Sequence, residues 1–88
     1  MKLQHKVAFV TGGGSGIGRA ICEHFAREGA IVVAADLKPE RALETAEIVT
    51  NAGGVALGLE IDVADATKVK VALGQAIDRY GRIDILVN

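Results

Sequence analysis

Short apolar runs alternate with longer segments of helical periodicity along the whole chain, and this alternation restricts the fold more than any other feature. Each apolar run has the length of a buried strand, and each segment between two runs carries apolar residues at helical spacing. Strands that alternate with helices indicate an α/β fold. The expected order is strand 7–10, helix 17–28, strand 30–35, helix 39–52, strand 55–63, helix 66–80 and strand 83–87.

Right-handed crossovers between these strands predict a parallel sheet with the spatial order 3-2-1-4. The first two helices should cover one face and the third helix the other. We therefore expect a three-layer α/β fold, the first half (β-α-β-α-β-α-β) of a Rossmann-type sheet. The fourth strand would leave an open apolar edge. A continuation of the chain, another segment or another copy should cover it, and we expect the intact protein to be a homo-oligomer.

Several packing details also follow from the periodicity. Asp65 is expected to cap the third helix, and Arg19 should point outward from the first. Even-numbered positions of strand 55–63 should form its less buried face, as at a sheet edge. The buried stripe of the second helix is expected to be Ala42, Leu43, Ala46 and Val49.

Composition and charge exclude several classes of function. The formal net charge is -1 and no basic block is present, so nothing indicates binding to nucleic acid or to an anionic membrane. No apolar stretch approaches the roughly 20 residues that span a bilayer, and no secretory signal opens the chain. Cys22 is the single cysteine, which excludes an internal disulfide and fits a reducing compartment. We therefore expect a cytoplasmic protein without a metal site.

A glycine-rich turn, Thr11–Gly18, lies between the first strand and the first helix. Gly12 allows a tight exit from the strand, Gly16 leaves room for a phosphate, and Gly18 allows close packing of the helix. The helix N-terminus offers unpaired N–H groups to a pyrophosphate. The alternative is a flexible loop without a ligand, but the position between strand and helix favours nucleotide binding.

Asp36 ends the second strand, 18 residues beyond Gly18. A carboxylate at this position can accept hydrogen bonds from the adenosine ribose hydroxyls, which predicts NAD(H) over NADP(H) as the coenzyme. The alternative is a polar residue that merely ends a strand.

The turn T-G-G-G-S-G-I-G resembles the coenzyme fingerprint of the compact branch of the short-chain dehydrogenase/reductase family. Asp62-Val63 is similar to the family's Asp-Val pair, and residues 84–88 look like the opening of its Asn-Asn-Ala-Gly motif. The resemblance implies that Asp62 and Val63 meet the adenine, that Leu37 lines the adenine side, and that Ser15 and the Ile17 backbone reach the phosphates or the nearby ribose. Asp62 could alternatively be a solvated carboxylate. The expected coenzyme-binding residues are Gly12, Gly14, Ser15, Gly16, Ile17, Gly18, Asp36, Leu37, Asp62 and Val63.

The family's catalytic tyrosine, with a lysine four residues later, has no counterpart in this chain. Tyr80 is the single tyrosine, and Asp84 stands four residues after it; Ser15, the single serine, belongs to the turn. The resemblance thus implies that residues 1–88 are the N-terminal part of a single dinucleotide-binding Rossmann domain. This part would bind the coenzyme of an NAD(H)-dependent oxidoreductase that interconverts a secondary alcohol and a carbonyl, with no catalytic residue among these 88. Two alternatives are a non-catalytic NAD(H)-binding or redox-sensing module and a structural fragment that binds no ligand.

Overall fold

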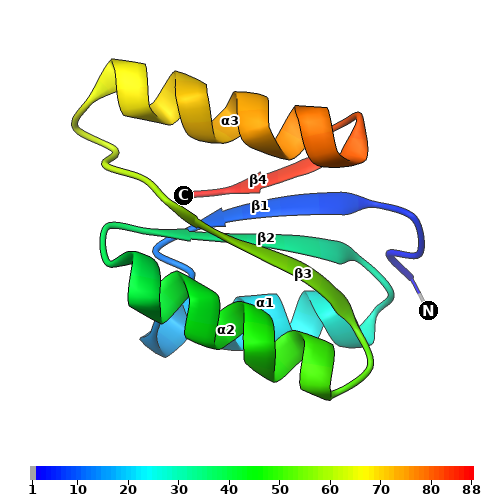
Figure 1. The fold of residues 1–88 in the computed structure, drawn as a ribbon. Coiled ribbons are helices and arrows are strands. Elements are labelled where there is room, and N and C mark those ends of the chain that lie inside the picture. The colour runs from blue at the N-terminus through cyan, green and yellow to red at the C-terminus, as the bar shows by residue number, and fades with distance from the viewer. Residues whose placement is uncertain (1) are drawn as a thin grey trace.

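The computed structural model describes residues 2–88, in which strands and helices alternate from end to end (Figure 1). The predicted order of elements is confirmed, and the observed bounds fall within a few residues of the expected ones. The elements are β1 (Val7–Thr11), α1 (Gly16–Arg27), β2 (Ile31–Asp36), α2 (Pro39–Asn51), β3 (Val55–Glu60), α3 (Ala66–Tyr80) and β4 (Ile85–Val87).

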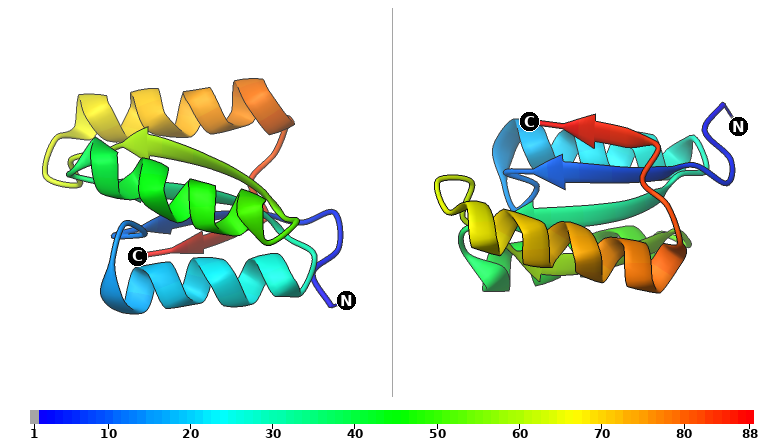
Figure 2. Two further views of the ribbon diagram at one scale, coloured as in Figure 1. Left: turned by 60° about the horizontal axis from the view of Figure 1, so that its bottom comes forward. Right: turned by 90° about the horizontal axis from the view of Figure 1, so that it is seen from above.

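The four strands form one parallel sheet in the order β3-β2-β1-β4, as predicted. Val7 pairs with Ile31 at the start of the sheet, and Thr11 pairs with Ala35 near its end. Because all strands run in the same direction, their carboxyl ends lie along one edge of the sheet (Figure 2). The loops that follow β1, β2 and β3 therefore meet at this edge.

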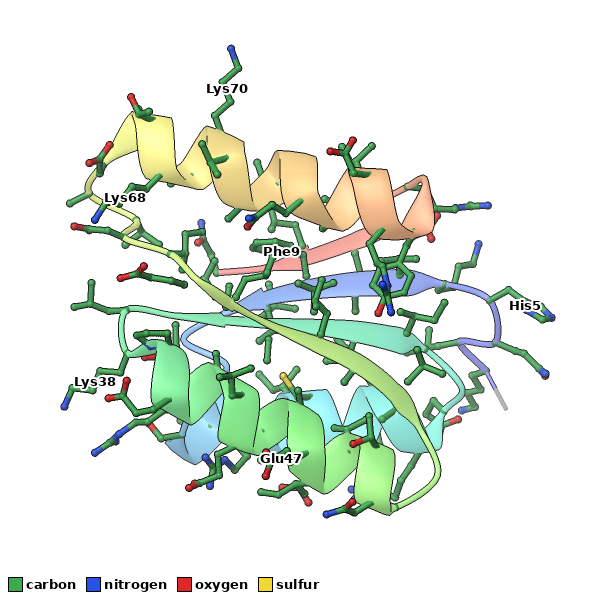
Figure 3. All side chains as sticks on the ribbon, in the orientation of Figure 1. His5, Phe9, Lys38, Glu47, Lys68 and Lys70 are labelled. Atoms are coloured by element: carbon green, nitrogen blue, oxygen red, sulfur yellow. The ribbon has the colours of Figure 1, made fainter. Side chains whose placement is uncertain are left out.

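Helices cover both faces of the sheet, with α1 and α2 on one side and α3 on the other (Figures 1 and 2). Residues 7–10 and 32–35 are buried because β1 and β2 are central strands covered on both faces. Alternate residues of each strand point to opposite faces. Phe9 lies on the α3 side (Figure 3), whereas Val10 packs in the cluster that contains Cys22 of α1. The predicted three-layer arrangement is confirmed.

Two expectations about α2 and the strand beside it were wrong in detail. Leu43 is 54% exposed, whereas Thr45 is fully buried, so the buried stripe of α2 contains Thr45 in place of Leu43. The even-numbered face of β3 is covered by α2, because a Cβ at Gly58 would lie only 2.7 Å from the carbonyl oxygen of Ala42. The small residues on this face of β3 let the backbone of α2 approach the strand closely.

The third strand is also shorter than predicted. It ends at Glu60, and Val63 lies beyond it with 65% of its surface exposed. Leu57 and Leu59 pack towards α3 as the alternation predicted, and β3 is an edge strand.

The fourth strand is held to β1 by Asp84. One carboxylate oxygen of Asp84 accepts a hydrogen bond from Val7 N at 2.8 Å, and the other accepts from the guanidinium of Arg82. The Arg82 hydrogen bond, followed by the bond from Val7 N, lowers the pKa of the Asp84 carboxyl. Beyond β4, the part of the sheet that the structure describes has no further strand, and Leu86 is 59% exposed.

Asp65 caps α3 as predicted, because its carboxylate accepts hydrogen bonds from Thr67 N at 3.0 Å and Lys68 N at 3.2 Å. We expect Asp65→Ala to lower the free energy of unfolding by about 1 kcal/mol, since two helix N–H groups lose their acceptor. Asp78→Ala is the matched control: Asp78 is an exposed aspartate of α3 whose side chain makes no hydrogen bond within residues 2–88. Its change should stay within about 0.5 kcal/mol. If urea denaturation shows the same loss of unfolding free energy in both variants, the capping role is contradicted.

None of the helices in the described residues is long and apolar enough to cross a membrane.

Candidate functional site

The candidate site lies at the carboxyl edge of the sheet, where three loops meet. The glycine-rich turn follows β1, Asp36 ends β2, and Asp62 follows β3. Ile61 N donates to the carbonyl oxygen of Asp36 at 3.0 Å, which ties the ends of β2 and β3 together. A pocket of about 200 Å³ opens between these segments and is lined by Gly12, Asp36, Leu37, Ile61, Asp62 and Val63. Five of these six residues belong to the set predicted from the sequence.

The open side of the glycine-rich turn is formed by Gly12, Ser15, Gly16 and Ile17, all of which are exposed. Gly12 and Gly16 have φ angles of 67° and 57°, a region that side chains other than glycine rarely adopt. Within the described chain, no heavy atom lies within 4 Å of the position that a Cβ would take at either glycine. The turn therefore leaves free space on its outer side.

The glycine-rich turn leads directly into α1, which begins at Gly16. Ser15 is the N-cap residue, but its side chain makes no capping hydrogen bond within residues 2–88. The hydroxyl of Ser15 and the N–H groups of the first helical turn are thus available to a ligand. Unpaired N–H groups and the helix dipole make such an end suitable for a phosphate.

Gly13 and Gly14, in contrast, are buried, and all four of their backbone polar groups are hydrogen-bonded, three of them to residues of β2 or α2 and one to Arg19 of α1. Gly13 N donates to Ala35 O at 3.1 Å, and Gly14 N donates to Oδ2 of Asp36 at 2.9 Å. Thr45 Oγ1 donates to Gly13 O at 2.7 Å, and Nη2 of Arg19 donates to Gly14 O at 2.6 Å. Gly14 was predicted as a coenzyme-binding residue, but its N–H is bound to Asp36 in this structure.

Gly18 packs against the turn itself. A Cβ at Gly18 would overlap the carbonyl oxygen of Gly12. The close approach that the sequence predicted for Gly18 is thus between the helix and the glycine-rich turn, more than between the helix and the sheet.

The Asp36 carboxylate is fixed by two backbone donors. Oδ2 accepts from Gly14 N, and Oδ1 accepts from Lys38 N at 3.0 Å. A carboxylate oxygen has two acceptor positions, so each oxygen of Asp36 keeps one for a further donor. Asp36 is half-buried and lines the pocket, where it can accept hydrogen bonds from two neighbouring hydroxyl groups.

Apolar side chains and a second carboxylate complete the pocket. Leu37 is 63% exposed and Val63 is 65% exposed, although both belong to its lining. Asp62 is half-buried, and its Oδ1 accepts a hydrogen bond from Ala64 N at 3.0 Å, which holds the loop after β3. The combination suits a flat, partly apolar ring whose polar edge meets a carboxylate.

Sequence reasoning missed two residues beside the site. Thr45 was not singled out, although it stands three residues after Ala42 and four before Val49, which is a helical spacing. Arg19 does not point outward as predicted, because it bonds to Gly14 O, to Thr45 Oγ1 and to Glu44. Its side chain is only 23% exposed.

Other residues that could carry chemistry lie in surroundings that indicate a structural role. Burial raises the pKa of the Cys22 thiol to about 11, so this thiol is protonated at neutral pH. Tyr80 is partly buried and packs against the core beneath α3. Asn88 accepts a hydrogen bond from Thr11 Oγ1 at 3.1 Å. In residues 2–88, no group of three or more His, Cys, Asp or Glu side chains is placed to hold a metal ion.

Comparison with known proteins identifies the family. The family model described as short chain dehydrogenase matches residues 6–88. This chain belongs to the short-chain dehydrogenase family. Its glycine-rich turn, Asp36 and Asp62 all lie inside the matched region.

Named members of the short-chain dehydrogenase family are similar along the whole chain. Sorbitol dehydrogenase of Cereibacter sphaeroides is 42% identical over 88 residues, which cover 100% of this chain and 33% of that protein. D-threitol dehydrogenase of Mycolicibacterium smegmatis is 45% identical over 87 residues, covering 99% of this chain and 34% of that protein. The chain thus spans about a third of the length of these relatives.

A solved structure supports the same assignment. The crystal structure of hydroxysteroid dehydrogenase from Escherichia coli matches with a TM-score of 0.96 and 34% sequence identity. The match covers 99% of this chain and 36% of that chain. The short-chain dehydrogenase fold therefore includes every element described above.

Proposed function

We propose that this chain is the N-terminal, coenzyme-binding part of a single Rossmann domain in an NAD(H)-dependent oxidoreductase. The observation that carries the proposal is the fixed Asp36 carboxylate, which lines the same pocket as Gly12 of the glycine-rich turn. In the complete protein, we propose the interconversion of a secondary alcohol and a carbonyl by hydride transfer. Relatives named sorbitol dehydrogenase and D-threitol dehydrogenase support a hydroxylated substrate.

The residues of the site fit a dinucleotide. The open space at Gly12 and Gly16 and the unpaired hydroxyl of Ser15 suit the pyrophosphate, while Asp36 suits the hydroxyls of the adenosine ribose. Leu37 and Val63 offer apolar contact to the adenine. We propose that the carboxylate of Asp62, which lines the same pocket, accepts from the adenine amino group.

The coenzyme, when bound, supplies or accepts the hydride, and this part of the protein binds and orients it. A proton must also move between the substrate oxygen and an acid or base. Tyr80, the single tyrosine of the chain, packs in the core below α3. We therefore propose that the proton-transfer residues belong to other parts of the complete protein.

Titration of the complete protein with NADH, followed by coenzyme fluorescence, tests the binding proposal. We expect saturable binding of NADH, weaker binding of NADPH, and a rise in the melting temperature with NADH, because a ligand of the native state stabilises it. A protein that is folded by circular dichroism and binds neither coenzyme would refute the proposal.

The alternative of a non-catalytic NAD(H)-binding or redox-sensing module is separated by an activity assay. NADH formation would be followed with a panel of polyols and secondary alcohols at saturating NAD. We expect turnover with at least one of them. Binding of NADH without turnover of any substrate, in either direction, would favour the binding module. A protein that neither binds NADH nor turns over a substrate would favour a structural fragment.

A further inference from the structure

One peptide unit connects the buried side chain of Thr45 to the carboxylate of Asp36. The carbonyl of Gly13 and the N–H of Gly14 belong to the same planar group. Thr45 Oγ1 donates to this carbonyl at 2.7 Å, and the N–H donates to Oδ2 of Asp36 at 2.9 Å. Because a trans peptide is rigid and its C=O and N–H point in opposite directions, a shift at one end moves the other.

Arg19 fixes the direction of the Thr45 hydrogen bond. Nε of Arg19 donates to Thr45 Oγ1 at 3.0 Å, and a guanidinium cannot accept a hydrogen bond. The hydroxyl of Thr45 therefore directs its own proton to Gly13 O. Thr45 is fully buried, so water does not compete for this bond.

The same guanidinium is itself held in place. Nη2 of Arg19 donates to Gly14 O and to Oε1 of Glu44, both at 2.6 Å. Arg19 comes from α1, whereas Glu44 and Thr45 come from α2. Two helices on one face of the sheet thus hold the inner side of the turn, while its outer side stays open.

We propose that Thr45 is a positioning residue for coenzyme recognition, acting through the Gly13–Gly14 peptide on Asp36. The proposal rests on the function proposed above. Thr45 does not line the pocket, so its effect on the coenzyme must pass through the carboxylate that meets the ribose. Loss of the hydroxyl would let the peptide rotate, and Asp36 would lose Gly14 N, one of the two backbone donors that fix it. Recognition of the ribose hydroxyls and repulsion of a 2′-phosphate would then weaken together.

Thr45→Val tests this proposal in the complete protein because it replaces the hydroxyl with a methyl group of similar size. We expect the affinity for NADH to fall about fivefold, as for the loss of one hydrogen bond. The affinity for NADPH should change less, so that the ratio of NADH affinity to NADPH affinity falls. Thr45→Ser is the matched control; it keeps the hydroxyl and should retain the ratio of the unmutated protein.

A double variant separates positioning from a general structural effect. If Thr45 acts through Asp36, adding Thr45→Val to Asp36→Ala should not weaken NADH binding further. Equal loss of NADH and NADPH affinity in Thr45→Val, or losses that add in the double variant, would overturn the positioning role. Absence of NADH binding by the unmutated protein would instead refute the function on which it rests.

Arg19→Lys provides a second variant should Thr45→Val fail to fold. A lysine keeps the positive charge beside Glu44 but has no counterpart of the Nε–H that orients the Thr45 hydroxyl. The ratio of NADH affinity to NADPH affinity should fall, as in Thr45→Val. An unchanged ratio in folded Arg19→Lys would count against the proposal.

Discussion

Asp36→Ala is expected to abolish the preference of the complete protein for NADH over NADPH. In the unmutated protein, charge-assisted hydrogen bonds from the ribose hydroxyls to Asp36 should contribute roughly 1.5–3 kcal/mol. A 2′-phosphate removes one hydroxyl and places about two negative charges beside the carboxylate, at a repulsion of roughly 1–4 kcal/mol. Together these effects favour NADH by at least about 2.5 kcal/mol, which is on the order of a hundredfold in affinity.

Basic side chains near Asp36 set how far the preference shifts in the variant. Lys38 points away from the sheet at this edge (Figure 3), and Leu37 carries no charge. The Cβ of Arg41 lies beside Asp36, because a Cβ at Gly14 would be 2.7 Å from both Arg41 Cβ and Asp36 Oδ2. We expect the Arg41 side chain, which starts from this position, to attract a phosphate once the carboxylate is removed, so that NADPH binds at least as tightly as NADH.

Coenzyme affinities of the two proteins should be compared by fluorescence titration at one salt concentration, since salt screens the repulsion. Glu40→Ala is the matched control because it removes an exposed carboxylate from the first turn of α2 with the same change in charge. It should leave the preference for NADH largely intact. If the unmutated protein binds NADPH as tightly as NADH, the assignment of Asp36 to the ribose is wrong.

Gly18→Ala should destabilise this chain strongly, although it adds only one methyl group. The new Cβ would overlap the Gly12 carbonyl oxygen and lie 3.1 Å from the Gly13 Cα, and both are backbone atoms that cannot rotate away. We expect the free energy of unfolding to fall by about 2–3 kcal/mol, at the upper end of overpacking effects. The turn would also move, so NADH affinity should fall with the stability.

Gly74→Ala is the control for Gly18→Ala. Gly74 also lies inside a helix, but no heavy atom of the described residues is within 4 Å of its Cβ position. Alanine there should raise the free energy of unfolding by up to about 1 kcal/mol, through the better helix propensity alone. Denaturant unfolding of both variants would decide: a Gly18→Ala protein as stable as Gly74→Ala would show that the turn relaxes without cost.

The sequence by itself determined the order of elements, the parallel sheet and the edge at which the site lies. Continuous apolar runs at β1 and β2 can be satisfied only by burial on both faces, and the helical segments between them force parallel crossovers. Positions next to strand ends then follow from chain order. For this reason Gly12, Asp36 and Asp62 were correctly expected to come together, and the pocket contains all three.

The tertiary structure decided which groups are paired with each other. Periodicity correctly predicted all but one residue of the buried stripe of α2. Only the packed helix shows that Thr45, and not Leu43, is buried. The bonds that fix the turn join Gly13 to Thr45 and Gly14 to Asp36, across 32 and 22 residues of sequence. Local propensity and periodicity carry no information on such pairs, because the partners meet only after the sheet and both helices have packed.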